Sequence, residues 1–324
     1  MSTSAAPNSL TWLANGFLAI KPLAALAKNR ARTMMIERAE SIGVYWRDEV
    51  QRLKARAGES PFSEQWSHDL ADLQNADLSY PDYYVTSFHA YEEGNLGWQP
   101  AMEVEVAAKA VHARIWPEAG AQGDAQLRQS YHDVLKANLA TAPTNIVDLG
   151  CGVGMSSETL QGTFPDAQLT GVDLSPYFLA VAQYRQQQSV RATAATVSAP
   201  TSSPTIHWYH AAAEATGLPQ GQFDLVSACL MFHELPQVAA IAILQEARRL
   251  LQPGGHLAIM DMNPNCETFA KMPPFVLTLL KSTEPYLDEY FSLDIADACR
   301  TAGFAPPTVV TNSPRHRTLI AAAI

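Results

Sequence analysis

The stretch Ile146-Val147-Asp148-Leu149-Gly150-Cys151-Gly152-Val153-Gly154 decides the fold. Its first half is a short apolar run typical of a buried strand, and its second half has glycine at alternate positions. Glycine is needed where the backbone takes a positive φ or where a ligand approaches the chain closely. The dinucleotide pattern G-x-G-x-x-G would place a glycine at position 155, where this chain has Met155. The stretch therefore predicts a buried strand and a tight loop that a ligand can approach.

A carboxylate follows on the next predicted strand. Gly171-Val172-Asp173-Leu174 places Asp173 at the end of that strand, 19 residues after Gly154. An acidic residue there can accept hydrogen bonds from both hydroxyl groups of a ribose. The two segments together favour a site for an adenosine-containing ligand over a plain strand-to-helix connection.

Residues 140–324 alternate short apolar runs with helical patterns. Strands are predicted at 145–149, 168–173, 205–210, 223–229 and 256–261, with helices between them. Such alternation is typical of a parallel sheet covered by helices on both faces. The last two runs, 308–311 and 318–323, are joined by so short a link that they must pair antiparallel. We predict an α/β fold with a doubly wound, mostly parallel seven-stranded sheet that closes on an antiparallel hairpin.

Residues 1–139 are predicted to form a helical N-terminal cap region. Residues 31–55 have an unbroken helical pattern, and two further helices are expected at 67–78 and 103–115. The aromatic loop 80–98 joins these two helices. Residues 1–57 carry 9 basic and 4 acidic side chains, whereas residues 58–133 carry 3 and 13. Opposite charges would hold the two parts together. We expect a boundary near residue 140, a loop insertion at 186–204, and a lid insertion at 263–292.

Composition excludes several classes of protein. With 47% hydrophobic and 17% charged residues in 324, the chain is globular, and its net charge of −10 argues against a nucleic-acid partner. The four cysteines lie far apart, which fits a reducing cytoplasm better than a disulfide framework or a zinc site. No segment has the length and continuity of a transmembrane helix. The protein is expected to be cytoplasmic.

The motifs at 148–154, 171–175, 213–214, 218–219, 223–226 and 250–255 resemble, in this order, those of class I S-adenosylmethionine-dependent methyltransferases. The resemblance covers residues 140–324 and is to the type 11 branch, which includes quinone-biosynthesis enzymes. It implies S-adenosylmethionine as cofactor, S-adenosylhomocysteine as product, and a small, hydrophobic or aromatic methyl acceptor. The cofactor-binding residues that it implies are Asp148, Gly150, Cys151, Gly152, Gly154, Asp173, Leu174, Ala213, Glu214 and Cys229. In the aromatic loop, Tyr84, Tyr91 and Gly94 are expected at the cofactor and His89 at the substrate.

His233, after the fourth strand, is the leading catalytic candidate. A sulfonium methyl group is already activated, so the enzyme mainly aligns the nucleophile, and a base is needed only for some acceptors. A histidine pKa near 6.5 suits removal of a proton from a phenol or enol. Alternatively, His233 caps the next helix. No metal ligand set is predicted.

Two other functions stay open at this stage. One is a nucleotide-dependent oxidoreductase, against which Met155 and the terminal hairpin argue. The other is a scaffold protein whose basic and apolar residues 10–32 dock on a membrane or partner. The oligomeric state cannot be read from the sequence.

Overall fold

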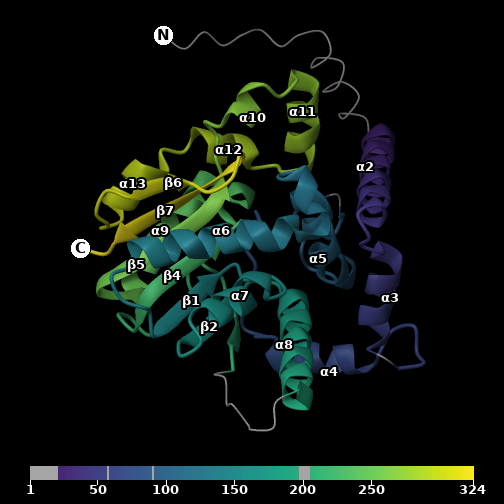
Figure 1. The fold of residues 1–324 in the computed structure, drawn as a ribbon, viewed down its shortest axis with the longest axis horizontal. Helices are drawn as coiled ribbons and strands as arrows, with labels where there is room; N and C mark the ends of the chain where they lie inside the picture. Colours follow the sequence, from purple (N-terminus) through teal and green to yellow (C-terminus); the bar gives the residue numbers. More distant parts are fainter. Residues whose placement is uncertain (1–20, 57, 90, 197–204) are drawn as a thin grey trace.

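The computed structural model describes residues 21–56, 58–89, 91–196 and 205–324. Its centre is a seven-stranded sheet with strand order β3-β2-β1-β4-β5-β7-β6 (Figure 1). Strands β1 to β5 are parallel, and β7 runs antiparallel to both β5 and β6. The predicted fold class is thus confirmed. The strands are β1 (Asn145–Leu149), β2 (Gln168–Asp173), β3 (His207–His210), β4 (Phe223–Cys229), β5 (Leu251–Met262), β6 (Thr308–Thr311) and β7 (His316–Ala322).

The order of the strands reverses beside β1. Leu149, the last residue of β1, pairs with Val172 of β2 on one side and with Ala228 of β4 on the other. The loops that leave β1 and β4 therefore diverge to opposite faces of the sheet. A crevice forms at such a switch point, beyond the carboxyl ends of the strands.

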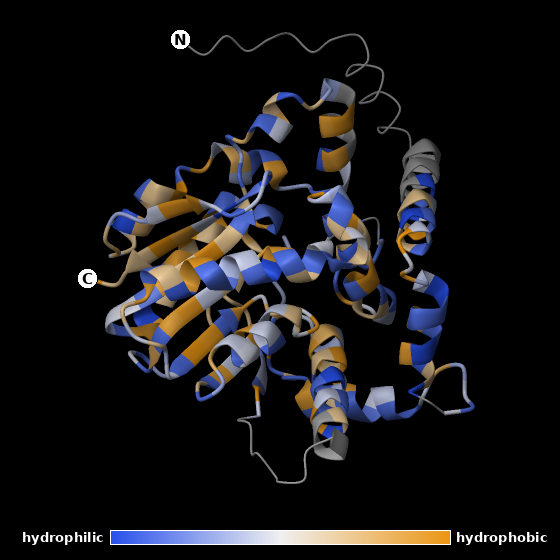
Figure 2. Cartoon of the chain, viewed as in Figure 1, coloured by the Kyte–Doolittle hydropathy of each residue, from blue (hydrophilic) through white to orange (hydrophobic). Residues whose placement is uncertain are grey.

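Helices cover both faces of the sheet. The side chains of neighbouring residues Ile146 and Val147 enter two different cores, as the alternation of a strand requires. The core around Ile146 is closed by α6 (Gly123–Asn138), α7 (Met155–Thr163) and α8 (Pro176–Thr196), and the core around Val147 by α9 (Gln237–Leu250), α12 (Leu287–Ser292) and α13 (Ile295–Thr301). In Figure 2 the strands are largely hydrophobic, while the helices carry hydrophilic residues as well.

The N-terminal helices form a third core beside the sheet. They are α2 (Lys21–Ser41), α3 (Trp46–Ala55), α4 (Gln65–Leu73) and α5 (Trp98–His112), followed by a short 3-10 helix, η1 (Pro117–Gln122). Helix α5 packs against α2 and α3 and also against α6 and α8, so it joins this region to the sheet. Buried Trp46, Trp66 and Met102 meet Phe178 of α8 in this core. Helix α6 packs on the sheet itself, although it precedes residue 140.

Several predicted elements differ from the structure. The helices expected at 67–78 and 103–115 span Gln65–Leu73 and Trp98–His112, and the strands expected at 205–210 and 318–323 span His207–His210 and His316–Ala322. The single helix expected over 31–55 is wrong: α2 ends at Ser41 and α3 begins at Trp46, because Gly43 takes a φ of 83° that a helix cannot contain. Helix α8 continues to Thr196, through the first part of the predicted loop insertion 186–204, whose residues 197–204 lie outside the described residues. Strand β5 begins at Leu251, five residues before the predicted strand.

The segment 263–292 contains α10 (Glu267–Ala270), α11 (Pro274–Thr283) and α12. Most of the predicted docking segment 10–32 lies outside the described residues, so membrane contact stays a prediction. None of the described helices is long and apolar enough to cross a membrane. All four cysteines are buried as free thiols.

Candidate active site

A cavity of about 770 Å³ lies at the carboxyl ends of the parallel strands. Its wall comes from the loop after β1, the ends of β2, β4 and β5, the aromatic loop, helices α2 and α5, and the segment 263–292. Ligand pockets commonly have volumes of about 300–1,000 Å³. The structure brings most of the predicted site residues to this wall: His89, His233, Gly150, Cys151, Gly152, Asp173, Leu174, Ala213, Glu214, Cys229, Tyr84 and Tyr91.

Asp148 does not line the cavity. Its carboxylate is completely buried and accepts hydrogen bonds from Ser156 Oγ (2.6 Å), Ser157 Oγ (2.7 Å) and Ser227 Oγ (3.0 Å). Burial raises the pKa of Asp148, and the three serine hydroxyls oppose that rise. Two of these serines belong to α7 and the third to β4. Asp148, near the end of β1, therefore links the start of the glycine loop (residues 150–154) to this helix and this strand.

Gly154 and Gly94 also lie outside the cavity wall, and packing explains why both are glycines. A Cβ atom on Gly154 would come within 2.7 Å of the Trp208 ring. On Gly94 it would lie 2.3 Å from the backbone oxygen of Thr86. Both residues have a positive φ, so a side chain would be strained as well as crowded.

Gly152 and Asp173 form the floor of the cavity. The backbone N–H of Gly152 donates to Asp173 Oδ2 at 2.8 Å, and the N–H of Ser175 donates to Oδ1 at 2.8 Å. Burial raises the pKa of Asp173 to about 6, although these two bonds oppose the rise. A Cβ atom on Gly152 would meet only open space, so the cavity begins directly at its backbone. Each Asp173 oxygen keeps a second lone pair for a ligand hydroxyl.

Glu214 offers a free acceptor in the same wall. Its Oε1 accepts a hydrogen bond from the Tyr83 hydroxyl at 2.7 Å, while its Oε2 is buried and has no partner among the described residues. Leu174 and Ala213 line the cavity with it. A buried acceptor without a donor is costly, and the amino group of an adenine would satisfy it. The residues present thus fit the adenosine-containing cofactor that the resemblance implies.

His233 forms a buried pair with Asp261. Helix η2 (Phe232–Glu234), after β4, carries His233, and Asp261 lies near the end of β5. His233 Nδ1 is 2.8 Å from Asp261 Oδ1, and the His233 backbone N–H donates to Oδ2 at 3.2 Å. Burial alone would lower the pKa of His233, but Asp261, with Glu284 and Glu234, raises it to about 10. His233 Nε2 lies 4.0 Å from Glu234 Oε1, beyond hydrogen-bond distance, so it can still bond to a ligand in the cavity.

His89 reaches the same place from the aromatic loop. Its Nε2 atom lies 3.1 Å from Glu284 Oε1 and 3.5 Å from Glu234 Oε1. Burial raises the pKa of Glu234 to about 7, while His89 and His233 oppose this. Ligand atoms of His89, His233 and Glu234 lie within 4.8 Å of one another, so the group has the geometry to hold a metal ion. The absence of a metal nonetheless stays our prediction.

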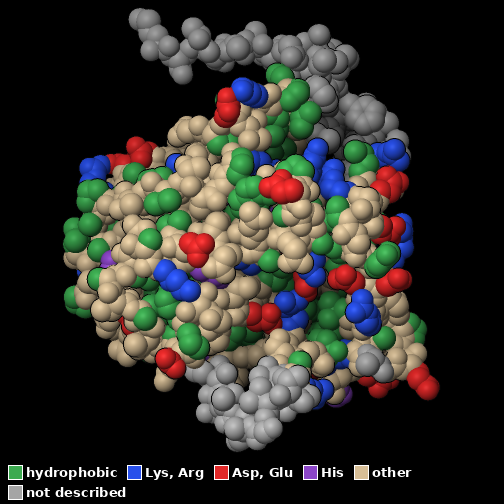
Figure 3. Space-filling view, in the orientation of Figure 1, with side chains coloured by type: hydrophobic (Ala, Val, Ile, Leu, Met, Phe, Trp, Pro, Cys, Tyr) green, Lys and Arg blue, Asp and Glu red, His purple; other side chains and the backbone are tan. Residues whose placement is uncertain are grey.

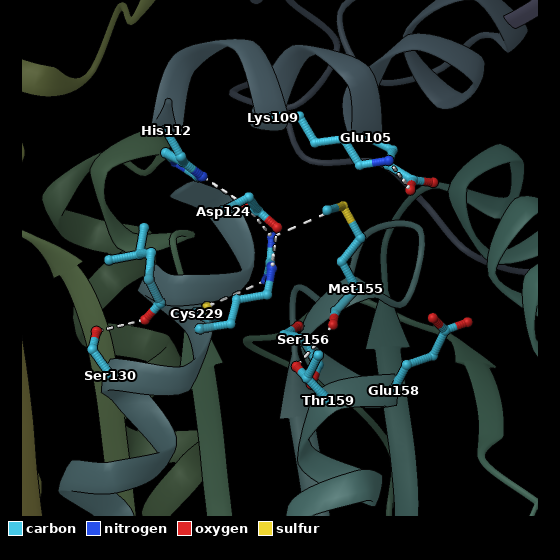
Figure 4. A network of polar contacts seen from close by, with 12 residues as sticks. Glu105, Lys109, His112, Asp124, Ser130, Met155, Ser156, Glu158, Thr159 and Cys229 are labelled. Carbon is cyan, nitrogen blue, oxygen red and sulfur yellow. Dashed lines mark hydrogen bonds and ion pairs between the residues drawn. The ribbon is translucent and has the colours of Figure 1, made fainter. Parts of the chain in front are cut away.

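Two residues of the cavity wall were not predicted from the sequence: Glu284 and Arg128. Glu284 lies in the segment 263–292, which carries no recognisable motif, and Arg128 lies in α6. Arg128 is buried and donates to Asp124 Oδ2 at 3.0 Å, and its two other nitrogens lie 3.7 Å from Cys229 Sγ and 3.9 Å from Met155 Sδ. His112 Nδ1 lies 2.6 Å from Asp124 Oδ1. Figure 4 shows His112 and Asp124 pointing toward one another, with Met155 and Cys229 at the edges of this network. These contacts hold Arg128 in the cavity wall, between the glycine loop and the end of β4.

Comparisons with known proteins find similarity to methyltransferases. A family model described as a methyltransferase domain matches residues 147–259. The ubiquinone biosynthesis O-methyltransferase of Aromatoleum aromaticum is 28% identical over 176 residues, which are 53% of this chain and 68% of that protein. The trans-aconitate 2-methyltransferase of Yersinia pestis is 45% identical over 69 residues, 21% of this chain and 27% of that protein. The CurJ carbon methyltransferase shares the fold, with a TM-score of 0.50 and 14% identity over 82% of this chain and 72% of that one.

Proposed function

We propose that this chain, which is a class I S-adenosylmethionine-dependent methyltransferase, methylates a hydroxyl oxygen of a small, largely apolar acceptor. The enzyme class and the cofactor follow from the family match and the named relatives, and the oxidoreductase alternative is set aside. The acceptor and the roles of individual residues are our proposal. The observation that carries it is His233, which is paired with buried Asp261 and lines the same cavity as Gly152 and Asp173.

S-adenosylmethionine, when bound, supplies a methyl group that its sulfonium sulfur already activates. We assign Asp173 to the ribose hydroxyls, Leu174 and Ala213 to the faces of the adenine ring, and Glu214 Oε2 to the adenine amino group. The backbone of Gly150 and Gly152 borders the remainder of the cofactor. These roles agree with the free lone pairs of Asp173 and with the unpartnered oxygen of Glu214.

The rest of the wall suits an apolar acceptor. Apolar side chains from the aromatic loop, from the end of β4 and from the segment 263–292 line the same cavity as His233: Phe88, Leu230, Met231, Phe269 and Leu280. These groups exclude water from the reacting oxygen. The similarity to an O-methyltransferase of ubiquinone biosynthesis supports an oxygen acceptor and an aromatic or hydrophobic body.

His233 Nε2 would hold the acceptor oxygen. Asp261 fixes the ring through Nδ1, so Nε2 faces the ligand. A neutral His233 takes the hydroxyl proton; a protonated His233 donates a hydrogen bond to an acceptor that is already ionised. In both cases the result is a protonated His233 next to an ionised acceptor oxygen. This oxygen is then nucleophilic. In-line displacement then needs only alignment of that oxygen with the carbon–sulfur bond.

Transfer of labelled methyl from S-adenosylmethionine into lipid and aqueous fractions of a cell extract tests the proposal. Label in the lipid fraction that is lost with Asp173→Ala supports an apolar acceptor. Alkaline hydrolysis of the product separates an ether from an ester, and an alkali-stable ether is expected. Release of the label as methanol would contradict methylation of a hydroxyl group. Absence of label in both fractions, despite binding of S-adenosylhomocysteine, would contradict the proposed acceptor class.

A further inference from the structure

Three arginines meet in the cavity wall from three distant parts of the chain. Arg38 lies in the last turn of α2, Arg114 follows the end of α5, and Arg315 lies in the turn between β6 and β7. We call these three residues the arginine cluster. Arg38 and Arg315 are half-buried and Arg114 is exposed. In Figure 3, basic side chains gather between the regions that α2 and α11 occupy in Figure 1.

The arginine cluster lacks the acidic partners that two other arginines of the wall have. Arg32 is paired with Glu103, and Arg128 is paired with Asp124. In residues 21–56, 58–89, 91–196 and 205–324, no carboxylate forms an ion pair with Arg38, Arg114 or Arg315. The remaining residues of the chain contain no Asp or Glu at all. The protein, which is acidic overall, thus leaves this group of positive charges uncompensated.

Holding these charges together is unfavourable. Burial and the nearby charge of Arg114 lower the pKa of Arg38. The pKa of Arg315 is lowered by burial and by the charges of Arg114 and Arg38. Arg315 Nε is buried without a hydrogen-bond partner among the described residues, and one terminal nitrogen reaches only the Val111 carbonyl oxygen, at 3.4 Å. Guanidinium groups with unused donors are typical of sites that bind carboxylate or phosphate.

The arginine cluster adjoins the catalytic part of the cavity. Arg315 and its buried neighbour His316 line the same cavity as His233. The charges of Arg315 and His233 also contribute to the lowering of the His316 pKa. Apolar Phe269 and Leu280 line the same cavity. A ligand with its reacting oxygen at His233 can therefore extend along an apolar wall toward the three arginines.

We propose that the arginine cluster binds an anionic group, a carboxylate or a phosphate ester, that the methyl acceptor carries in addition to the oxygen that is methylated. The inference rests on the proposed function, because it concerns the same acceptor. It narrows the substrate class from apolar molecules in general to apolar acids.

Calorimetric titration of the full chain with inorganic phosphate and with malonate tests the site without any methyl transfer. Saturating S-adenosylhomocysteine keeps these anions out of the cofactor site, and low ionic strength limits screening. We expect saturable binding of at least one anion, weakened roughly tenfold or more in Arg315→Gln and in Arg38→Gln. Arg300→Gln, an exposed side chain of α13 outside the cavity wall, is the matched control and should bind as the wild type does. Binding of S-adenosylhomocysteine verifies that each variant is folded.

The anion that binds identifies the anionic group of the methyl acceptor: binding of phosphate alone indicates a phosphate ester, and binding of malonate alone indicates a carboxylate. Failure of both to bind saturably, or equal binding by wild type and Arg315→Gln, would overturn the inference. In a second assay, the labelled product from the extract is passed over an anion-exchange resin, which should retain it. Label only in neutral products would overturn the inference and leave methyl transfer intact. Without any label the proposed function fails, and the anion titration still decides whether the arginine cluster is a site.

Discussion

His233 Nδ1 lies 2.8 Å from Asp261 Oδ1, so a carboxylate at the end of β5 orients an imidazole that follows β4. The two strands are neighbours in the sheet, and both side chains are buried. This pairing engages Nδ1 of His233, while Nε2 lies 4.0 Å from Glu234 Oε1. Asp261 also contributes to the rise of the His233 pKa to about 10.

Replacing either partner should reduce turnover far more than cofactor binding. We expect His233→Asn to lower kcat by about 10²–10⁴ because the acceptor oxygen loses its proton partner. Asp261→Asn should lower kcat less, since Nε2 remains but is neither oriented nor made basic. His207→Asn, at the exposed start of β3, is the control. An unchanged kcat in His233→Asn would show that His233 serves only to cap or pack. An equal loss of kcat in the control would show that the loss is not specific to His233.

The rate should depend on pH through His233 and the acceptor. Because Asp261 raises the pKa of His233 to about 10, the imidazole is protonated at neutral pH and pairs with an ionised acceptor. For a phenolic acceptor, kcat/KM should rise with pH from 6 to about 10 and fall when His233 loses its proton. A profile measured from pH 6 to 10.5 checks this. A decrease in kcat/KM between pH 7 and 9 would contradict the assignment.

Cofactor affinity should weaken in acid because Asp173 titrates. Burial raises the pKa of Asp173 to about 6, and only its ionised form accepts from both ribose hydroxyls. Affinity is therefore complete above that pKa and is lost as the pH falls through it. If binding requires the carboxylate, the Kd of S-adenosylhomocysteine should rise about tenfold between pH 7 and 5. Asp173→Asn should bind weakly at all pH values, and exposed Asp166→Asn should match the wild type.

Two glycines provide a matched test of the cavity floor. Gly152→Ala adds a methyl group at a φ of 56°, directed into the cavity, and should weaken S-adenosylhomocysteine binding at least tenfold. Gly162→Ala adds the same group to open space in α7 and should stabilise the fold by about 1 kcal/mol without affecting binding. Calorimetric titration measures the binding of S-adenosylhomocysteine, and thermal unfolding measures the stability of each variant. Unaltered binding in Gly152→Ala would exclude its backbone from the cofactor site.

Dialysis against a chelator should leave methyl transfer unchanged, in line with the predicted metal-free mechanism. In the described structure, His89 already has Glu284 and Glu234 as partners, and His233 has Asp261. Elemental analysis of the purified protein accompanies the assay. Loss of activity that added Mg²⁺ or Zn²⁺ restores would instead make His89, His233 and Glu234 metal ligands.

Local patterns were sufficient for much of the sheet. The bounds of β1, β2, β4 and β6 were predicted to the residue, because each is a short apolar run between turn residues. The long N-terminal helix was predicted wrongly, since one glycine, Gly43, breaks a pattern that is otherwise helical on both sides. Gly150, Gly152 and Asp173 lie in the cavity wall, as predicted, because the carboxyl ends of the parallel strands converge there.

By itself the sequence determined the fold class, the enzyme class and the cofactor, because these depend on residues close together in ordered motifs. Only the tertiary structure brought His233 to Asp261, His89 to Glu284, and Arg38 to Arg114 and Arg315. These partners are separated by 28 to 277 residues along the chain, and no local spacing relates them. The packing of the N-terminal helices and the segment 263–292 over the sheet decides which charges meet. The tertiary structure thereby decided which charged side chains share the cavity wall with His233.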